Sequence, residues 1–246
     1  MWEQILPALR INIFATILFG LIYPLGITGV CQVLFRHQAN GSLITMGDKV
    51  VGSEIIGQNF TKPEYFHPRP SSAGNGYDAT ASSGSNLAAT SAKLVHGTTK
   101  MDDKKNEVVD FDGINLRIVH YCVENDIPYE SSLPLDQFKD ANGSLDDVKL
   151  IKAFNNDKAP LVFTARAPIP ADAVTASSSG LDPHISPDSA RVQAPRVAKA
   201  RGISSDQVTP LIVQYTEQPS LGVLGDPRVN VLLLNLALDQ RFAVKH

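Results

Sequence analysis

A long stretch without charged side chains near the N-terminus constrains the fold most. Ile11 to Phe35 contains no Asp, Glu, Lys, Arg or His, and Arg10 and Arg36 stand at its two ends. A helix of about 25 residues rises roughly 37 Å, enough to cross the ~30 Å hydrocarbon core of a bilayer with some tilt. In lipid, a helix satisfies all its backbone N–H and C=O groups within one segment. The sequence therefore predicts a transmembrane helix over residues 11–35, preceded by a short lead-in over residues 1–10.

The alternative interpretation of this stretch is a cleaved signal peptide. The hydrophobic region of a signal peptide spans about 7–15 residues and ends at a cleavage site of small residues. The stretch here is longer, and no such site follows Phe35. The sequence therefore favours a retained membrane anchor.

Residues that weaken helices inside the span indicate a partner in the membrane. Thr16 and Gly20 are four positions apart, a spacing of small residues that lets another helix backbone approach closely. Pro24 has no N–H, so it removes the helical hydrogen bond to Gly20 and predicts a kink there. Glycine and proline are in any case more common in membrane helices than in soluble ones. We nevertheless expect Thr16, Gly20 and Pro24 to contact another membrane helix.

Overall charge and composition narrow the class of protein. The formal net charge of the 246 residues is −3, so no basic field indicates a nucleic-acid partner. The hydrophobic content of 43% is typical of a folded chain. Positive residues flank the span on both sides, so the charge pattern does not orient it in the membrane.

Local patterns predict a mixed α+β soluble domain over residues 36–246. Residues 42–46 and 49–51 flank Gly47-Asp48, which predicts a β-hairpin with glycine first in a two-residue turn. Helix signals follow at an apolar repeat over 114–124, a Ser144/Asp147 capping pair, Ser186-Pro187 to Gly202, a Ser204–Gln207 capping box, and Asn230. Leu233, Leu236 and Ala237 are expected to form the apolar face of the last helix.

The stretch from Asn59 to Ser91 is rich in turn-forming residues. Gly, Ser, Thr, Asn, Ala and Pro dominate it, which is typical of a linker. A flexible linker has no use for the aromatic side chains that are spaced along it, Phe60, Tyr65, Phe66 and Tyr77. We therefore expect an ordered loop that packs on the rest of the domain.

Common catalytic and metal-binding motifs are absent from the sequence. It contains no G-x-x-x-x-G-K-[ST] phosphate loop, no Asp-Lys-Thr-Gly phosphorylation motif, no H-E-x-x-H pair and no G-x-S-x-G elbow. The sequence therefore predicts no catalytic residue, no metal site and no bound cofactor in this chain, and it leaves a nucleotide site undetermined.

Several long strings identify a resemblance to a known family. They are HQANGSLI (37–44), GSEIIGQNFTKPEYFHPRPSSAG (52–74), SGSNLAATS (83–91), TASSSGLDPHISPDSA (175–190), QAPRVAKARG (193–202) and GDPRVNVLLLNLALD (225–239). Together with the span, they resemble the C subunits of bacterial Kdp potassium-transporting P-type ATPases.

The resemblance implies an accessory subunit with no catalytic centre of its own. Its implied partners are a potassium-translocating A subunit, an ATP-hydrolysing B subunit, a small F peptide and the lipid bilayer, with no nucleic acid. It also implies a single-pass protein of the bacterial inner membrane with an extracytoplasmic soluble domain. The family is credited with raising the ATP affinity of the pump as a catalytic chaperone, so ATP and K⁺ act at the level of the complex.

The sequence departs from the family pattern at two places. Residues 95–167 are charged and partly helical, and they stand where the family commonly has a shorter connection, so we expect an insertion that folds outside the shared core with few contacts to it. Ser178 stands where the family commonly has glycine. If that glycine serves a positive φ angle, serine strains the loop by about 1 kcal/mol.

The loop residues of these strings are the expected contacts with partner subunits. Together with the three membrane residues, the set is Gln58, Asn59, Phe60, Tyr65, Phe66, Arg69, Pro70, Ser85, Asn86, Leu181, Asp182 and His184. Asn and Asp bond their own turns, so Asn59, Asn86 and Asp182 are expected to be mainly structural. Tyr65, Phe66 and Arg69 are expected to be contacts, because aromatic residues and arginine dominate interface hot spots. The alternative functions are a membrane-anchored extracytoplasmic binding module and an envelope hydrolase.

Overall fold

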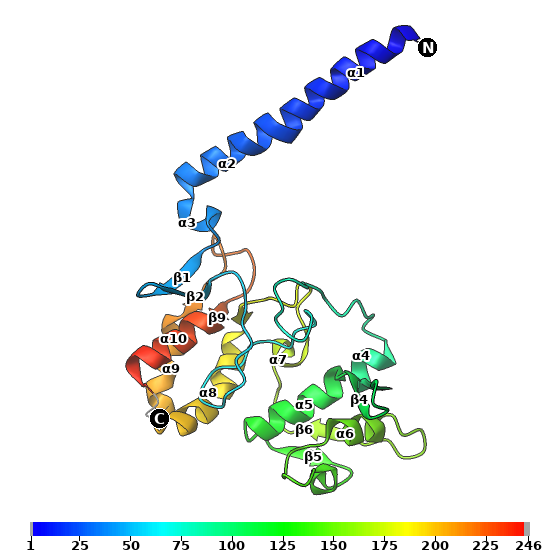
Figure 1. Ribbon diagram of the computed structural model, residues 1–246. Helices are drawn as coiled ribbons and strands as arrows, with labels where there is room; N and C mark the ends of the chain where they lie inside the picture. The colour runs from blue at the N-terminus through cyan, green and yellow to red at the C-terminus, as the bar shows by residue number, and fades with distance from the viewer. Residues whose placement is uncertain (1, 244–246) are drawn as a thin grey trace. The chain divides into compact units, whose positions relative to one another are not determined.

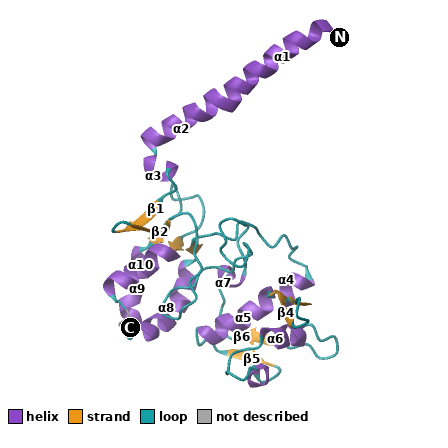
Figure 2. Ribbon diagram, viewed as in Figure 1, coloured by secondary structure: helices purple, strands orange, loops and turns teal. Residues whose placement is uncertain are grey.

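The computed structural model describes residues 2–243, in two compact units, Met1–Ile55 and Ile56–His246 (Figure 1). The first unit is a long helix followed by a β-hairpin, and the second is a mixture of helices and short antiparallel sheets (Figure 2). The α+β class with one N-terminal apolar helix is confirmed.

The N-terminal helix is long enough to cross a membrane. It comprises α1 (Trp2–Ile17), the π-helical segment η1 (Leu18–Ile22) and α2 (Tyr23–Leu34). The apolar part runs over Glu3–Leu34, 32 residues, and none of its most apolar window is buried by the rest of the chain. The helix therefore begins before the expected span and ends within one residue of it.

A π-helical turn lies directly before Pro24. The N–H of Tyr23 donates to the carbonyl of Leu18, five residues back, and Pro24 then occupies the first turn of α2. Proline has no N–H, so it cannot continue the regular i to i−4 ladder of hydrogen bonds at this position. The hydroxyl of Thr28 donates to the carbonyl of Pro24 at 2.8 Å. The helix thus accommodates the proline with one wider, π-helical turn. Such turns often occur at functional sites.

The predicted hairpin is present in the first unit. After α3 (Arg36–Ala39), strand β1 (Leu43–Met46) pairs antiparallel with β2 (Lys49–Ser53). Gly47 opens the turn with a φ of 60°, the left-handed conformation in which glycine is at ease. The Ser53 hydroxyl donates to the carbonyl of Gly41 at 2.6 Å and ties the hairpin to the end of α3.

The second unit contains two lobes. The core lobe, residues 56–91 and 166–243, contains α7 (Ala171–Val174), α8 (Pro187–Arg201), α9 (Ser205–Gln214), α10 (Val231–Arg241) and the sheet β7-β9-β8 (His184–Ile185, Arg228–Asn230, Thr216–Glu217). The second lobe, residues 92–165, contains α4 (Ala92–His96), β3 (Thr98–Met101), β4 (Glu107–Phe111), α5 (Gly113–Glu124), β5 (Tyr129–Ser131), η2 (Leu135–Phe138), α6 (Asp147–Phe154) and β6 (Phe163–Ala165).

The core lobe is built around α8, α9 and α10. Their buried side chains form one cluster with Phe66, Ile185 and Val229, and Phe66 is among its fully buried members. Three predicted caps are confirmed at these helices: Ser186 accepts from the N–H of Ser189, Ser204 and Gln207 form a capping box, and Asn230 accepts from the N–H of Leu233. These caps satisfy N–H groups that the helices leave without partners.

The second lobe has its own apolar cluster, formed by Leu116, Val119, Leu135, Phe138, Leu150, Ile151, Phe154 and Leu161. A third cluster joins the lobes, because Tyr121, Cys122 and Ile127 pack with side chains that include Ile169, Ala173 and Val192 of the core lobe. The expectation of few contacts between residues 95–167 and the rest is therefore wrong at α5. This helix is buried on two sides, so a single apolar repeat describes only part of its surface.

Three local expectations are corrected by the structure. Asp146, rather than Ser144, caps α6, since its carboxylate accepts from the N–H of Lys149 at 3.0 Å. Ala237 of the expected apolar face of α10 is buried, but Leu233 and Leu236 are less buried than the other leucines of that helix, because its first two turns are apolar on almost every side and give little periodicity. Ser178 is not among the described non-glycine residues with positive φ, so the expected strain at this position is absent.

Candidate functional site

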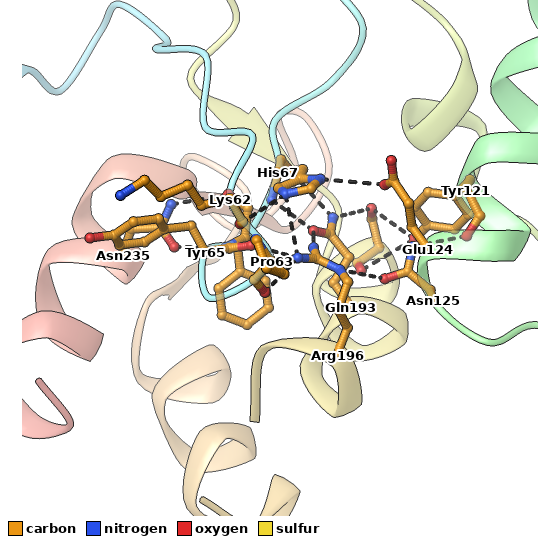
Figure 3. Close-up of polar contacts among 12 residues, drawn as sticks. Lys62, Pro63, Tyr65, His67, Tyr121, Glu124, Asn125, Gln193, Arg196 and Asn235 are labelled. Carbon is orange, nitrogen blue, oxygen red and sulfur yellow. Dashed lines mark hydrogen bonds and ion pairs between the residues drawn. The ribbon is translucent and has the colours of Figure 1, made fainter. Parts of the chain in front are cut away.

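Two side-chain amides hold the backbone of adjacent loop residues in the core lobe. Gln193 of α8 accepts from the N–H of His67 at 2.7 Å and donates to its carbonyl at 3.2 Å. Asn235 of α10 accepts from the N–H of Phe66 at 2.8 Å and donates to its carbonyl at 3.0 Å. Buried backbone groups need such partners, and this loop has no strand to supply them. We call residues 62–67 the clamped loop (Figure 3).

Arg196 adds a second restraint to the clamped loop. One guanidinium nitrogen donates to the carbonyls of Pro63 at 2.7 Å and Tyr65 at 3.0 Å. The other nitrogens donate to the side chains of Asn125 at 3.1 Å and Gln193 at 2.8 Å (Figure 3). Burial lowers the pKa of Arg196. Since Asn125 lies directly after α5, this arginine fastens the loop to both lobes at once.

Arg201, at the end of α8, completes the restraint on the loop. Its side chain is fully buried and donates to the carbonyls of Glu64 at 2.7 Å and Phe242 at 3.0 Å, and to Asp239 at 2.8 Å. The guanidinium also lies 5.0 Å from the centre of the Tyr65 ring. The Tyr65 hydroxyl donates to Asp239 at 3.0 Å, and burial together with this carboxylate raises the Tyr65 pKa.

A second pair of loops is joined by Arg69 and Asp182, which form an ion pair at 2.9 Å. Arg69 also donates to the carbonyl of Thr175 at 3.3 Å. The Tyr77 hydroxyl is within hydrogen-bond distance of the carbonyls of Arg69 and Asp182, and its pKa is raised mainly by burial. A Cβ at Gly57 would lie 2.4 Å from the Tyr77 ring, so this position accepts only glycine without rearrangement.

Glycine is also required where these loops cross. The Ser71 hydroxyl donates to the carbonyl of Gly180 at 2.6 Å. Gly180 has a φ of 68°, and a Cβ there would lie 2.7 Å from the backbone N of Ala73 and from the carbonyl oxygen of Ser83. Both the backbone conformation and the space exclude a larger side chain.

A cavity of about 390 Å³ lies between α5 and the loop residues at either end of the clamped loop, 59–61 and 67–71. Arg117, His120 and Glu124 line it from α5, and His67 and Arg69 line it from the loop side. Each of these side chains faces an oppositely charged partner. The closest contacts between acidic and basic atoms are Arg69–Asp182 (2.9 Å), Arg117–Asp112 (2.6 Å), His120–Asp147 (2.7 Å) and His67–Glu124 (3.5 Å).

These ion pairs determine the electrostatics of the cavity. The hydrogen bond to Asp147 raises the pKa of His120 against the effect of burial. Burial acts to raise the pKa of Glu124, but its interactions with His67, His120 and Arg196 outweigh burial, so the net shift is downward. Groups of both signs that are paired in this way do not create a field of one sign that would attract a charged ligand.

Phe66 differs from the other expected contact residues. Its side chain is fully buried in the core lobe, so a role as a partner contact does not fit, because a side chain without exposed surface cannot reach another chain. Tyr65 and Arg69 are partly exposed, but both make the internal contacts described above. Alanine at either position is therefore expected to lower stability, although the sequence predicts partner contacts and not structural roles for these two residues.

The remaining expected residues lie in four places. Asn59, Phe60 and Pro70 line the cavity, which Gln58 precedes in the chain. Ser85 and Asn86 line a separate hollow with residues 176–178, and Asn86 has a φ of 53°, which asparagine tolerates. Leu181 accepts at its carbonyl from the N–H of Gly57, and His184 lies in β7 with its ring 3.4 Å from Asp182. Thr16, Gly20 and Pro24 belong to the first unit.

The residues that do most to hold the site were not singled out from the sequence. Gln193, Arg196, Arg201 and Asn235 stand inside strings quoted for the family resemblance, yet no role was predicted for any of them. One signal was available for Asn235, a polar residue in the middle of an otherwise apolar helix. A buried amide needs partners, and its own helix supplies none for the side chain.

Comparison with known proteins identifies the family. The family model described as "K+-transporting ATPase, c chain" (KdpC) matches residues 5–112 and 137–240. The chain belongs to the KdpC family. The family model passes over residues 113–136, a shorter stretch than the expected insertion at 95–167.

Curated relatives carry the KdpC name as well. The protein "Potassium-transporting ATPase KdpC subunit" of Beijerinckia indica is 43% identical over 245 residues, which is 100% of this chain and 98% of that protein. The proteins of the same name from Myxococcus xanthus and Caulobacter vibrioides are 42% and 44% identical. Each of these two alignments covers 98% of this chain, and they cover 90% and 95% of those proteins. A KdpC-family chain with a candidate membrane helix is placed at a membrane, in a potassium-transporting ATPase complex.

Proposed function

We propose that this chain is a non-catalytic accessory subunit that docks on the potassium-translocating A subunit and stabilises its assembly with the ATP-hydrolysing B subunit and a small F peptide. Its soluble unit lies on the extracytoplasmic side of the inner membrane. The family membership supports the complex, and the arrangement of the clamped loop supports the docking role.

The clamped loop carries this proposal. The polar side chains of α8 and α10 form hydrogen bonds with the carbonyls and N–H groups of the clamped loop. These bonds fix the backbone conformation of the loop. Long loops without helix or strand inside a compact domain are usually functional. A loop already held in one conformation binds a partner without the entropic cost of ordering. Thr61, Lys62 and Pro63 are exposed next to the clamps and are the proposed docking residues, together with Asn59.

The alternatives, an envelope hydrolase and a small-ligand binding module, receive less support. Within residues 2–243 no group of three or more His, Cys, Asp or Glu side chains is placed to hold a metal ion. The charged groups that line the cavity already have partners within the chain, and one of these pairs, His67–Glu124, joins the two lobes. Both observations support a role of this unit in assembly.

Removal of the membrane helix tests the docking of the first unit. A chain lacking residues 1–36 is expected to fold and to lose co-purification with the translocating subunit in detergent, because the small-residue face of the helix can no longer pack against a membrane partner. Stoichiometric assembly of the truncated chain would contradict this, and would make the helix an anchor only.

A matched pair of full-length variants separates packing from anchoring. Gly20→Leu fills the small-residue face, where an added Cβ lies 3.9 Å from Thr16, and is expected to weaken co-purification at least tenfold. Gly26→Leu makes the same change at a glycine with open space around it and is expected to have a smaller effect. Equal effects would contradict a contact at the Thr16–Gly20 face.

A further inference from the structure

The hairpin between β8 and β9 ends in an ordered tip. A bridge between Ser220 and Leu224 extends the pairing beyond the two strands, with backbone hydrogen bonds of 2.9 Å in both directions. The N–H of Gly222 also donates to the carbonyl of Pro219 at 2.9 Å. We call residues 219–225 the apolar tip. Its backbone is thus fixed by hydrogen bonds of its own.

The side chains of this tip are apolar and exposed. Leu221 is 90% exposed, Val223 80% and Leu224 58%. Leu221 and Val223 are the most exposed large hydrophobic residues in the described part of the second unit. A patch of exposed apolar side chains often marks an interaction site, because the removal of apolar surface from water is favourable.

Leu221 has a backbone conformation that its side chain disfavours. Its φ is 55°, in the left-handed region where a leucine is an outlier. Glycine would relieve this strain, and Gly222 and Gly225 in the same turn do adopt positive φ angles. Neither stability nor solubility favours a leucine here, and strained residues of this kind cluster at functional sites.

The charge of the hairpin indicates what covers the tip. Residues 218–227 contain one charged residue, Asp226, and no Lys, Arg, Trp or Tyr. Segments that insert into lipid use basic residues to approach anionic headgroups and aromatic residues at the interface. The nearest charges in the two strands, Glu217 and Arg228, pair with each other at 2.9 Å. The connection over residues 218–227, with one acidic residue and no basic or large aromatic residue, therefore fits a protein pocket better than a bilayer surface.

We propose that the apolar tip inserts into an apolar pocket of another subunit of the potassium-transporting ATPase complex. This rests on the proposed function, because it requires the chain to assemble with such subunits. The tip offers two branched aliphatic side chains on a rigid turn, and a pocket lined by apolar side chains would bury both.

A photo-crosslinking residue at position 223 tests the occupant directly. In the complete complex, purified in detergent and in lipid nanodiscs, a covalent product with another protein subunit is expected in both preparations. A product with lipid alone, a product with a second copy of this chain, or no product would overturn the proposal.

Two substitutions measure the contribution of the tip. The variant Leu221→Asn with Val223→Thr keeps a residue that tolerates left-handed backbone and keeps the β-branched shape, but removes apolar surface. It is expected to leave the melting temperature of the full chain unchanged and to weaken its retention in the complex at least tenfold. The control Val162→Thr, at an exposed valine of the second lobe, is expected to leave both unchanged.

The outcomes distinguish the two proposals. If the unaltered chain does not co-purify with any partner subunit, the proposed function fails. If the unaltered chain assembles, but the double variant is retained equally well, only the docking of the tip fails.

Discussion

Replacing Arg201 by alanine is expected to lower the free energy of unfolding by about 3–5 kcal/mol. The guanidinium is fully buried and donates to two carbonyls and to Asp239. Its removal leaves those carbonyls without donors and leaves the carboxylate of a partly buried ion pair without its cation. The packing of the guanidinium against the Tyr65 ring is lost as well.

Two controls accompany this change, measured by urea denaturation of the full chain in detergent. Arg201→Lys keeps the charge but not the planar fork, and it is expected to recover only part of the loss. Lys199→Ala removes an exposed charge from the same helix and is expected to shift stability by no more than about 0.5 kcal/mol. An effect of Arg201→Ala as small as that of Lys199→Ala would contradict the restraint assigned to Arg201.

Replacing Asn235 by leucine is expected to lower the free energy of unfolding by about 2–4 kcal/mol. Leucine keeps the volume of the side chain but cannot bond the N–H and carbonyl of Phe66. Each buried backbone group left unpaired costs about 1–3 kcal/mol. The same denaturation experiment measures the loss.

An exposed amide provides the matched control for Asn235. Gln214→Leu makes a comparable change where the side chain accepts from Arg241 at the surface, and an effect within about 0.5 kcal/mol is expected. If Asn235→Leu were as mild, the clamp on Phe66 would not be needed to hold the loop.

Elements with local signals could be predicted from the sequence. The hairpin at Gly47 needs only a turn glycine between two short strands, and α8, α9 and α10 begin at the residues that their caps indicate. These signals act over a few residues, so they can be read without knowledge of the fold. The aromatic residues of the loop over residues 59–91 also made it possible to expect that this loop is ordered.

The contacts that hold the site could not be predicted in the same way. Gln193 and Asn235 reach loop residues 126 and 169 positions away, and Arg69 reaches Asp182 across 113 positions. No periodicity or motif spacing encodes such a pairing. The position of α5 between two apolar clusters could not be predicted either, because it depends on how the two lobes pack together.

The π-helical turn of the membrane helix is another feature that the sequence does not predict. Pro24 indicates a disturbance of the helix, but the sequence does not say which form it takes. The structure places a π-helical turn over Leu18–Ile22, so the hydrogen bonds shift by one residue ahead of the proline.

The proposed function requires that this chain contributes docking, and no catalysis, to the ATPase. Acid-stable labelling by radiolabelled ATP, in the reconstituted complex and in the isolated chain, tests this directly. We expect label on the ATP-hydrolysing subunit alone, with no label and no ATPase activity in the isolated chain. Label on this chain, or ATP hydrolysis by it, would overturn the proposed function.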